Sequence, residues 1–99
     1  MPVSPAPYDS GDASSTVTSA NVTTSDTEVL AAKGNRSRIM LWNQSASDIY
    51  VSFGSTCTTS NCSLMLTASG GYFITDDYKG AVRATVASGS ATLWITEWA

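Results

Sequence analysis

The chain has 99 residues, of which 13% are charged, and its formal net charge of −3 gives an isoelectric point near 4.4. This length allows one domain with a modest core. Nucleic acid is excluded as a partner, because phosphate binding needs clustered Lys and Arg and the five basic residues are scattered. No apolar run approaches the roughly 20 residues that span a bilayer, and the first residues lack the pattern of a secretory signal. We therefore expect a protein made in a cytoplasm, not exported by that route and not bound to a membrane.

Residues 1–19 contain all three prolines and almost no large apolar side chain. Such a segment cannot bury enough surface to offset the entropy of ordering it. We expect a flexible N-terminal arm, which either becomes ordered against a neighbour or has no role. A single β-sandwich domain follows over residues 20–99. Val17 and Val22 are consistent with a first edge strand near this boundary.

The middle of the chain alternates apolar runs with polar turns. Residues 27–32 are expected to form a strand, with a short helix as the alternative, and Gly34 suits the turn that follows. Arg38–Asn43 and Ile49–Phe53 are two apolar runs joined by a polar turn, a pattern typical of a β-hairpin. We place this hairpin at the centre of the fold.

The later part of the chain repeats the pattern. Residues 63–67 and 72–74 are expected to be short strands separated by a Gly-Gly turn, and residues 81–87 and 91–98 a second hairpin. The sequence thus contains about seven to eight short strands and no useful helical periodicity. This predicts an all-β fold, either a small antiparallel β-sandwich of the jelly-roll or immunoglobulin-like kind or a barrel.

Strand alternation divides the apolar residues into an inner and an outer set. The inner set, which we expect to form the core, is Leu30, Ile39, Leu41, Ile49, Val51, Phe53, Leu64, Leu66, Phe73, Val82, Ala84, Val86, Leu93 and Ile95. The outer set places large apolar side chains where a solvated sheet would show polar ones: Met40, Trp42, Tyr50, Trp94 and Trp98. Such patches usually mark an interface. The alternative is that the second sheet or the arm covers some of them; we favour subunit contact.

The inventory of reactive side chains argues against catalysis. The chain has no His, and its one adjacent carboxylate pair, Asp76 and Asp77, should point to different sides of a loop. No phosphate-binding or dinucleotide-binding motif is present. We expect a protein that is not an enzyme and uses no metal or cofactor. Two cysteines, Cys57 and Cys62, are too few for a zinc site. They either form a disulfide with each other or remain free thiols, and we weigh these two alternatives equally.

Several motifs in their order carry a resemblance to a known family. They are the apolar strand ending in Asn43, the run Ile49-Tyr50-Val51-Ser52-Phe53-Gly54, the pair Gly70-Gly71, the run Gly80-Ala81-Val82-Arg83-Ala84, and the ending Gly89-Ser90-Ala91-Thr92-Leu93-Trp94-Ile95-Thr96-Glu97-Trp98. Over roughly residues 29–98 the chain resembles small structural proteins of tailed bacteriophages, in particular capsid decoration (cement) proteins.

The resemblance implies a virion protein without an active site, located on the capsid surface, that bridges subunits of the major capsid protein. A homotrimer is the implied state, since threefold positions of a capsid lattice suit it. Arg36 and Arg83 would then be polar interface contacts or solvated charges. The alternative function is a tail-tip or fibre-associated module in which exposed aromatic residues and loops recognise a host glycan or receptor.

Overall fold

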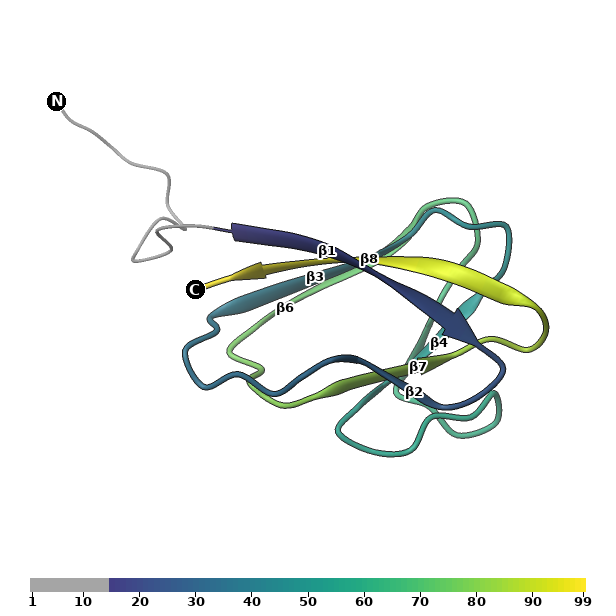
Figure 1. Cartoon of the computed structure of the whole chain (residues 1–99), viewed down its shortest axis with the longest axis horizontal. Coiled ribbons are helices and arrows are strands. Elements are labelled where there is room, and N and C mark those ends of the chain that lie inside the picture. The colour runs from purple at the N-terminus through teal and green to yellow at the C-terminus, as the bar shows by residue number, and fades with distance from the viewer. Residues whose placement is uncertain (1–14) are drawn as a thin grey trace, which may run out of the picture.

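The computed structural model describes residues 15–99, which form eight β-strands and contain no helix (Figure 1). The strands are β1 (Ser15–Thr23), β2 (Thr27–Leu30), β3 (Arg38–Asn43), β4 (Ile49–Phe53), β5 (Leu64–Leu66), β6 (Gly71–Asp76), β7 (Val82–Thr85) and β8 (Ser90–Trp98). The prediction of seven to eight short strands is confirmed. The segment for which a short helix was the alternative is a strand, β2.

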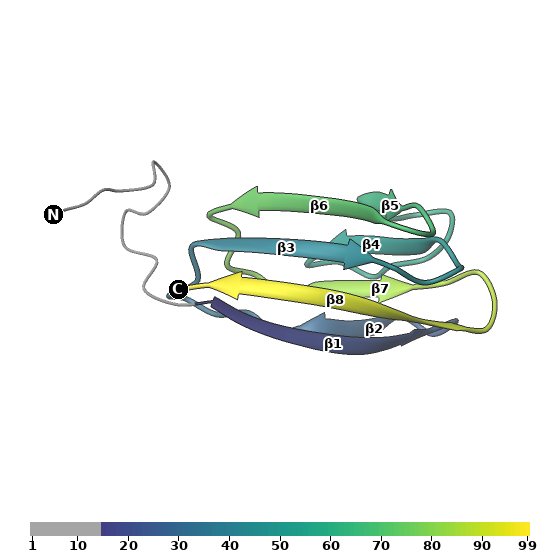
Figure 2. The ribbon, with the colours of Figure 1, turned by 90° about the horizontal axis from the view of Figure 1, so that it is seen from above.

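The strands form two antiparallel four-stranded sheets that face each other, with the orders β1-β8-β3-β6 and β2-β7-β4-β5 (Figure 2). Their pairing is nested: the first strand pairs with the last, the second with the seventh, the third with the sixth and the fourth with the fifth. This order of eight strands in two sheets is that of a jelly roll. The predicted antiparallel sandwich is therefore confirmed. Of the two kinds expected, jelly-roll and immunoglobulin-like, the strand order is that of the jelly roll.

The core lies between the two sheets and contains the expected inner set. Its buried predicted members are Leu30, Ile39, Leu41, Ile49, Val51, Leu66, Val82, Ala84, Val86, Leu93 and Ile95. The remaining three, Phe53, Leu64 and Phe73, are partly buried and pack against this cluster. Val22 and Ala91, which pair across β1 and β8, join the core without having been predicted.

Both predicted hairpins are wrong, because each pair of strands is divided between the sheets. β3 belongs to one sheet and β4 to the other, and the same holds for β7 and β8. Each connecting turn is therefore an arch that crosses from one layer to the other. The apolar residues of the two strands still face one interior, but they meet across the core and not side by side in one sheet.

A buried amide accounts for the first arch. Asn43, at the end of β3, is fully buried, and its Nδ2 donates hydrogen bonds to the carbonyls of Ser47 (2.8 Å), Leu66 (2.9 Å) and Thr67 (3.2 Å). Its Oδ1 accepts bonds from the backbone N–H and the hydroxyl of Ser45, at 2.9 and 2.7 Å. One side chain thus satisfies the polar backbone where the chain leaves one sheet and where β5 ends in the other.

The boundary of the N-terminal arm also changes. β1 begins at Ser15, so residues 15–19, assigned to the arm from the sequence, form the first half of an edge strand paired with β8. The strand expected around Val17 and Val22 is confirmed. The rest of the expected flexible arm, residues 1–14, lies outside the described residues.

Arg36 is neither an interface residue nor a solvated charge, because its side chain is fully buried. Its guanidinium donates to the carbonyls of Ala31 (3.1 Å), Tyr78 (3.1 Å) and Gly80 (2.5 Å). It also forms an ion pair with Glu97 at 3.3 Å. Arg36 therefore joins the β2–β3 loop, the β6–β7 loop and the end of β8 at one end of the sandwich, where a charge is tolerated because every contact is polar.

Candidate functional site: the outer face of one sheet

Large apolar side chains cover the outer face of the β1-β8-β3-β6 sheet. Directly paired residues on neighbouring strands share a face, so the register places these side chains in rows across the sheet. One row is Tyr72, Trp42, Trp94 and Ser19; the next is Ile74, Met40, Thr96 and Val17; the third is Asp76, Arg38, Trp98 and Ser15. We call the seven apolar members of these rows, Val17, Met40, Trp42, Tyr72, Ile74, Trp94 and Trp98, the aromatic face.

Five of the seven side chains of the aromatic face are exposed to solvent, whereas Met40 and Trp98 are partly buried. The exposed fractions are 64% for Tyr72, 60% for Val17, 49% for Ile74, 39% for Trp94 and 36% for Trp42. Because an aromatic side chain can bury about 150–250 Å², these five residues leave on the order of 500 Å² of apolar surface uncovered. That area lies in the range of about 300–600 Å² found for the largest patch of a monomer, which is often functional.

A charged pair borders this face at one end. Arg38 Nε lies 2.6 Å from Asp76 Oδ1 across β3 and β6, and the guanidinium carbon lies 5.8 Å from the centre of the Trp98 ring. The two charges cancel, so the face carries no net charge from its three rows. A partner can therefore approach it without repulsion of like charges. Asp76 is the last residue of β6 and forms an ion pair with Arg38, so it does not belong to the loop in which the sequence analysis placed both carboxylates.

The structure brings together four of the five predicted interface residues. Met40, Trp42, Trp94 and Trp98 lie on the aromatic face, and they include every tryptophan of the chain. Tyr50 does not join them, because β4 belongs to the other sheet.

The sequence analysis missed Val17, Tyr72 and Ile74 as members of the aromatic face. The signal for two of them was present, since Tyr72 and Ile74 alternate with the predicted core residue Phe73.

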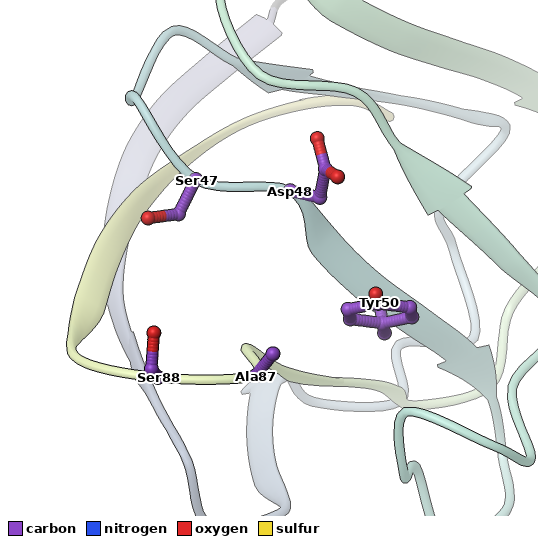
Figure 3. A pocket seen from close by; sticks show the side chains of 5 residues that line it. All are labelled: Ser47, Asp48, Tyr50, Ala87 and Ser88. Atoms are coloured by element: carbon purple, nitrogen blue, oxygen red, sulfur yellow. The ribbon is translucent and has the colours of Figure 1, made fainter.

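Tyr50 instead lines a small pocket at the end of the sandwich where both arches lie. The pocket has a volume of about 210 Å³ and is bounded by Ser47, Asp48, Tyr50, Ala87 and Ser88. Figure 3 shows Ser47 and Asp48 on one side, Ala87 and Ser88 on the opposite side, and the Tyr50 ring between them. Its lining thus includes an aromatic ring and two serine residues, whereas the Asp48 carboxylate points away from Ala87 and Ser88 (Figure 3).

The Asp48 carboxylate is held by a residue outside the pocket. Its Oδ1 accepts a hydrogen bond of 2.8 Å from the backbone N–H of Ala68. The neighbouring carbonyl of Ser47 accepts bonds from Asn43 Nδ2 at 2.8 Å and Ser45 Oγ at 3.0 Å. The arch therefore holds this side of the pocket in one arrangement.

Polar contacts on the second sheet are structural. Arg83 forms an ion pair with Asp26 at 2.9 Å and a longer one with Glu28 at 3.9 Å. The hydrogen bond from Arg83 lowers the pKa of Asp26, and the same bond raises the pKa of Arg83. Arg83 is about 30% exposed and already satisfied by these carboxylates, which removes it from the set of free interface charges.

Cys57 and Cys62 carry free thiols in the structure. Cys57 is buried, and its thiol donates a hydrogen bond to the Tyr50 carbonyl at 3.1 Å. Its backbone N–H donates to Asp26 Oδ1 at 3.3 Å. Burial raises the pKa of the Cys57 thiol. Of the two predicted alternatives, the structure has the free thiols.

Neither a metal site nor a membrane span is found in the described part of the chain. Within residues 15–99, no group of three or more His, Cys, Asp or Glu side chains could hold an ion. The same residues include no helix that could cross a membrane.

Comparisons with models of known protein families, with curated proteins and with solved structures find no match to this chain.

Proposed function

We propose that this chain is a non-enzymatic structural protein of a tailed-phage virion, a capsid decoration (cement) protein that contacts the major capsid protein through its aromatic face. The observation that carries the proposal is the contiguous apolar surface on the outer side of one sheet. The largest apolar patch of a folded domain is often functional, and aromatic residues are enriched where proteins contact each other. The jelly roll is also a common architecture of viral capsid domains.

The size of the aromatic face favours attachment by several copies. About 500 Å² of apolar surface is less than the roughly 800 Å² per partner that a stable protein–protein interface buries. Association costs about 4–15 kcal/mol in lost freedom, so a single copy would be held weakly. Three linked copies that engage the shell together would be held much more firmly, because the second and third contacts are intramolecular. This supports the homotrimer on a threefold position of the head.

The location is tested by counting copies in purified virions. We expect quantitative mass spectrometry to find the chain in amounts comparable to the major capsid protein, and labelled antibodies to decorate the head. A few copies on the tail would favour the alternative function below. Absence from particles that are otherwise complete would overturn the proposal.

The contact itself is tested by co-sedimentation with capsids that lack the protein. The double variant Trp42→Ser, Trp94→Ser should remain folded and lose most of its binding. Met65→Ser is the matched control, because Met65 is 44% exposed but lies on the other sheet. Equal loss of binding in the control would mean that the aromatic face is not the contact. Light scattering gives the native mass, expected to be that of three copies.

The alternative function, a tail-tip or fibre-associated module that recognises a host glycan, has its own observation. The Tyr50 pocket offers an aromatic ring beside the serine residues Ser47 and Ser88, and sugars are bound by such combinations of ring stacking and hydrogen bonding. The exposed Trp rings could serve in the same way. Titration with simple sugars, followed by NMR signals of Tyr50 and Asp48, separates the two functions: specific shifts there would favour the glycan module.

A further inference from the structure

The edge of the sandwich beside β6 contains an apolar pocket. It has a volume of about 230 Å³, is bounded by Phe53, Phe73, Thr75 and Tyr78, and its walls are almost entirely apolar. The ring centres of Phe53 and Phe73 lie 5.6 Å apart, and those of Phe53 and Tyr78 lie 5.1 Å apart in an edge-to-face arrangement. All four residues are only partly buried, so three aromatic rings form a surface that the domain itself leaves uncovered.

The pocket is open because the two sheets are unequal at this edge. β6 has six residues, whereas β5, the edge strand of the other sheet, has three and pairs only with Ile49, Tyr50 and Val51 of β4. Figure 2 shows β5 behind the beginning of β6, with the later part of β6 extending beyond it. Phe53 and Thr75 lie in this uncovered part, at the end of the sandwich opposite the two arches.

The size and chemistry of the pocket limit what it can hold. Small-molecule sites usually have volumes of about 300–1,000 Å³, so this pocket suits one or two side chains and not a cofactor. Grooves lined by aromatic rings are the surfaces that bind proline-rich segments in the polyproline II conformation. A proline ring lies flat against an aromatic ring, and the segment is already extended before it binds.

The chain supplies such a segment at its own start. Residues 1–14 precede β1 and include Pro2, Pro5 and Pro7, the only prolines of the sequence; the first two have the spacing Pro-x-x-Pro. Net charge does not oppose docking, because residues 1–8 contain no charged side chain. The aromatic pocket is correspondingly apolar.

The register shows that this segment can reach the pocket of the same copy. Ser15 pairs with Trp98, Trp98 with Arg38, and Arg38 with Asp76. β1 therefore begins at the end of the sheet where β6 ends, three strand spacings away, which is about 14 Å. The seven residues between Pro7 and Ser15 can span up to about 23 Å. This leaves Pro2 to Pro7 free to lie in the pocket.

We infer that residues 2–7 dock as a proline-rich ligand onto the aromatic pocket formed by Phe53, Phe73, Thr75 and Tyr78 of the same copy. A tether of this length gives an effective concentration on the order of millimolar. An intrinsic dissociation constant of about 1 mM is then enough to keep the segment bound about half of the time or more. None of the four pocket residues belongs to the aromatic face, although β6 contributes side chains to both surfaces. The docking can therefore be tested independently of capsid binding.

The composition of the chain makes this testable with few signals. The sequence has two phenylalanines, both in the pocket, and three prolines, all in the docking segment. In the full chain with labelled Phe and Pro, we expect nuclear Overhauser effects between proline ring protons and the two phenylalanine rings. The triple variant Pro2→Ser, Pro5→Ser, Pro7→Ser should lose these effects and shift both phenylalanine signals. The control Ser10→Ala, Ser14→Ala should leave them unchanged.

A substitution in the pocket tests the same contact from the other side. Thr75→Arg places a long side chain across the opening while its charge stays in solvent, and should abolish the proline contacts with little change in melting temperature. Absence of contacts in the unmodified chain, or phenylalanine signals identical in the triple-proline variant, would overturn the inference. Mixing chains labelled only at Phe with chains labelled only at Pro should give no contacts. Contacts in that mixture would show docking between copies and overturn the assignment to one copy.

Discussion

Replacement of the buried Asn43 is the sharpest test of how the first arch is held. Asn43→Ala removes the donor that three backbone carbonyls share and the acceptor for Ser45. Each buried group left without a partner costs about 1–3 kcal/mol. Only the bond to Leu66 is wholly buried, so solvent compensates some of the others, and we expect a loss of about 2–4 kcal/mol in the free energy of unfolding.

The loss is measured by urea unfolding followed by circular dichroism. With a urea dependence of about 1 kcal/mol/M for a domain of this size, the midpoint should fall by about 2–4 M. The melting temperature should fall by about 8–32 °C, at about 4–8 °C per kcal/mol. Gln44→Ala is the control, because Gln44 is the next residue in the chain and its side chain is exposed. This substitution should change the free energy of unfolding by less than about 0.5 kcal/mol.

A second substitution separates hydrogen bonding from volume. Asn43→Asp keeps the size and the acceptor but turns the donor into an oxygen that faces the three carbonyls. It should therefore destabilise at least as much as Asn43→Ala. If Asn43→Ala costs no more than Gln44→Ala, or if Asn43→Asp is the milder change, the amide is not what holds the arch.

Three further predictions concern other parts of the domain. Asp26→Asn should lower the free energy of unfolding at pH 7 but not at pH 2, because Arg83 lowers the pKa of Asp26 in the folded state. The stability that the carboxylate contributes is therefore present above the pKa of Asp26 in the unfolded chain and is lost as the pH falls through its pKa in the folded domain. An equal loss at both pH values in urea titrations would contradict this. Alkylation under native conditions should modify Cys62 first and Cys57 only as the domain opens, because Cys57 is buried and its pKa is raised; modification of neither thiol without reductant would indicate a disulfide. Gly71→Ala should cost about 1–3 kcal/mol in thermal unfolding, since a methyl group there would lie 2.5 Å from backbone of the preceding turn, and a neutral result would mean that this turn can move aside.

The fold class and the core were predictable from alternation along the strands, but the partner of each strand was not. A hairpin and an arch have the same local pattern, two apolar runs around a polar turn. What decides between them is which distant strand offers a better partner: β3 pairs with β6 and β8, and β4 with β5 and β7. These contacts are far apart in the sequence and leave no local signal.

Two polar residues that face inward, Asn43 and the partly buried Glu97, had signals that the sequence analysis did not use. Asn43 continues the inward series of Ile39 and Leu41, and Glu97 continues that of Leu93 and Ile95. A polar residue in an inward position needs a buried partner. For Glu97 that partner is Arg36, whose own position in a turn gives no indication of burial.

The aromatic face was predicted in its centre and missed at its edges. Trp42 and Trp94 stood out because tryptophan on an outward strand position is uncommon, whereas Val17 lay in the presumed arm. Tyr50 was placed on the correct side of its strand. Tyr50 lies away from the aromatic face because β4 belongs to the other sheet. Which sheet a strand joins depends on long-range pairing.

The nested pairing has a consequence for how the chain is made. β8 is the last of the eight strands along the chain and an inner strand of its sheet, between β1 and β3. Until β8 has left the ribosome, β1 and β3 have no common neighbour. Within residues 15–99, β4 and β5 are the one hydrogen-bonded pair of strands that follow each other in the sequence. Folding of this kind depends on distant contacts and is slow, and the unfinished chain exposes unpaired strands. Translation pauses before β8 emerges would therefore prolong an aggregation-prone state, whereas rapid synthesis of β8 would let the domain close.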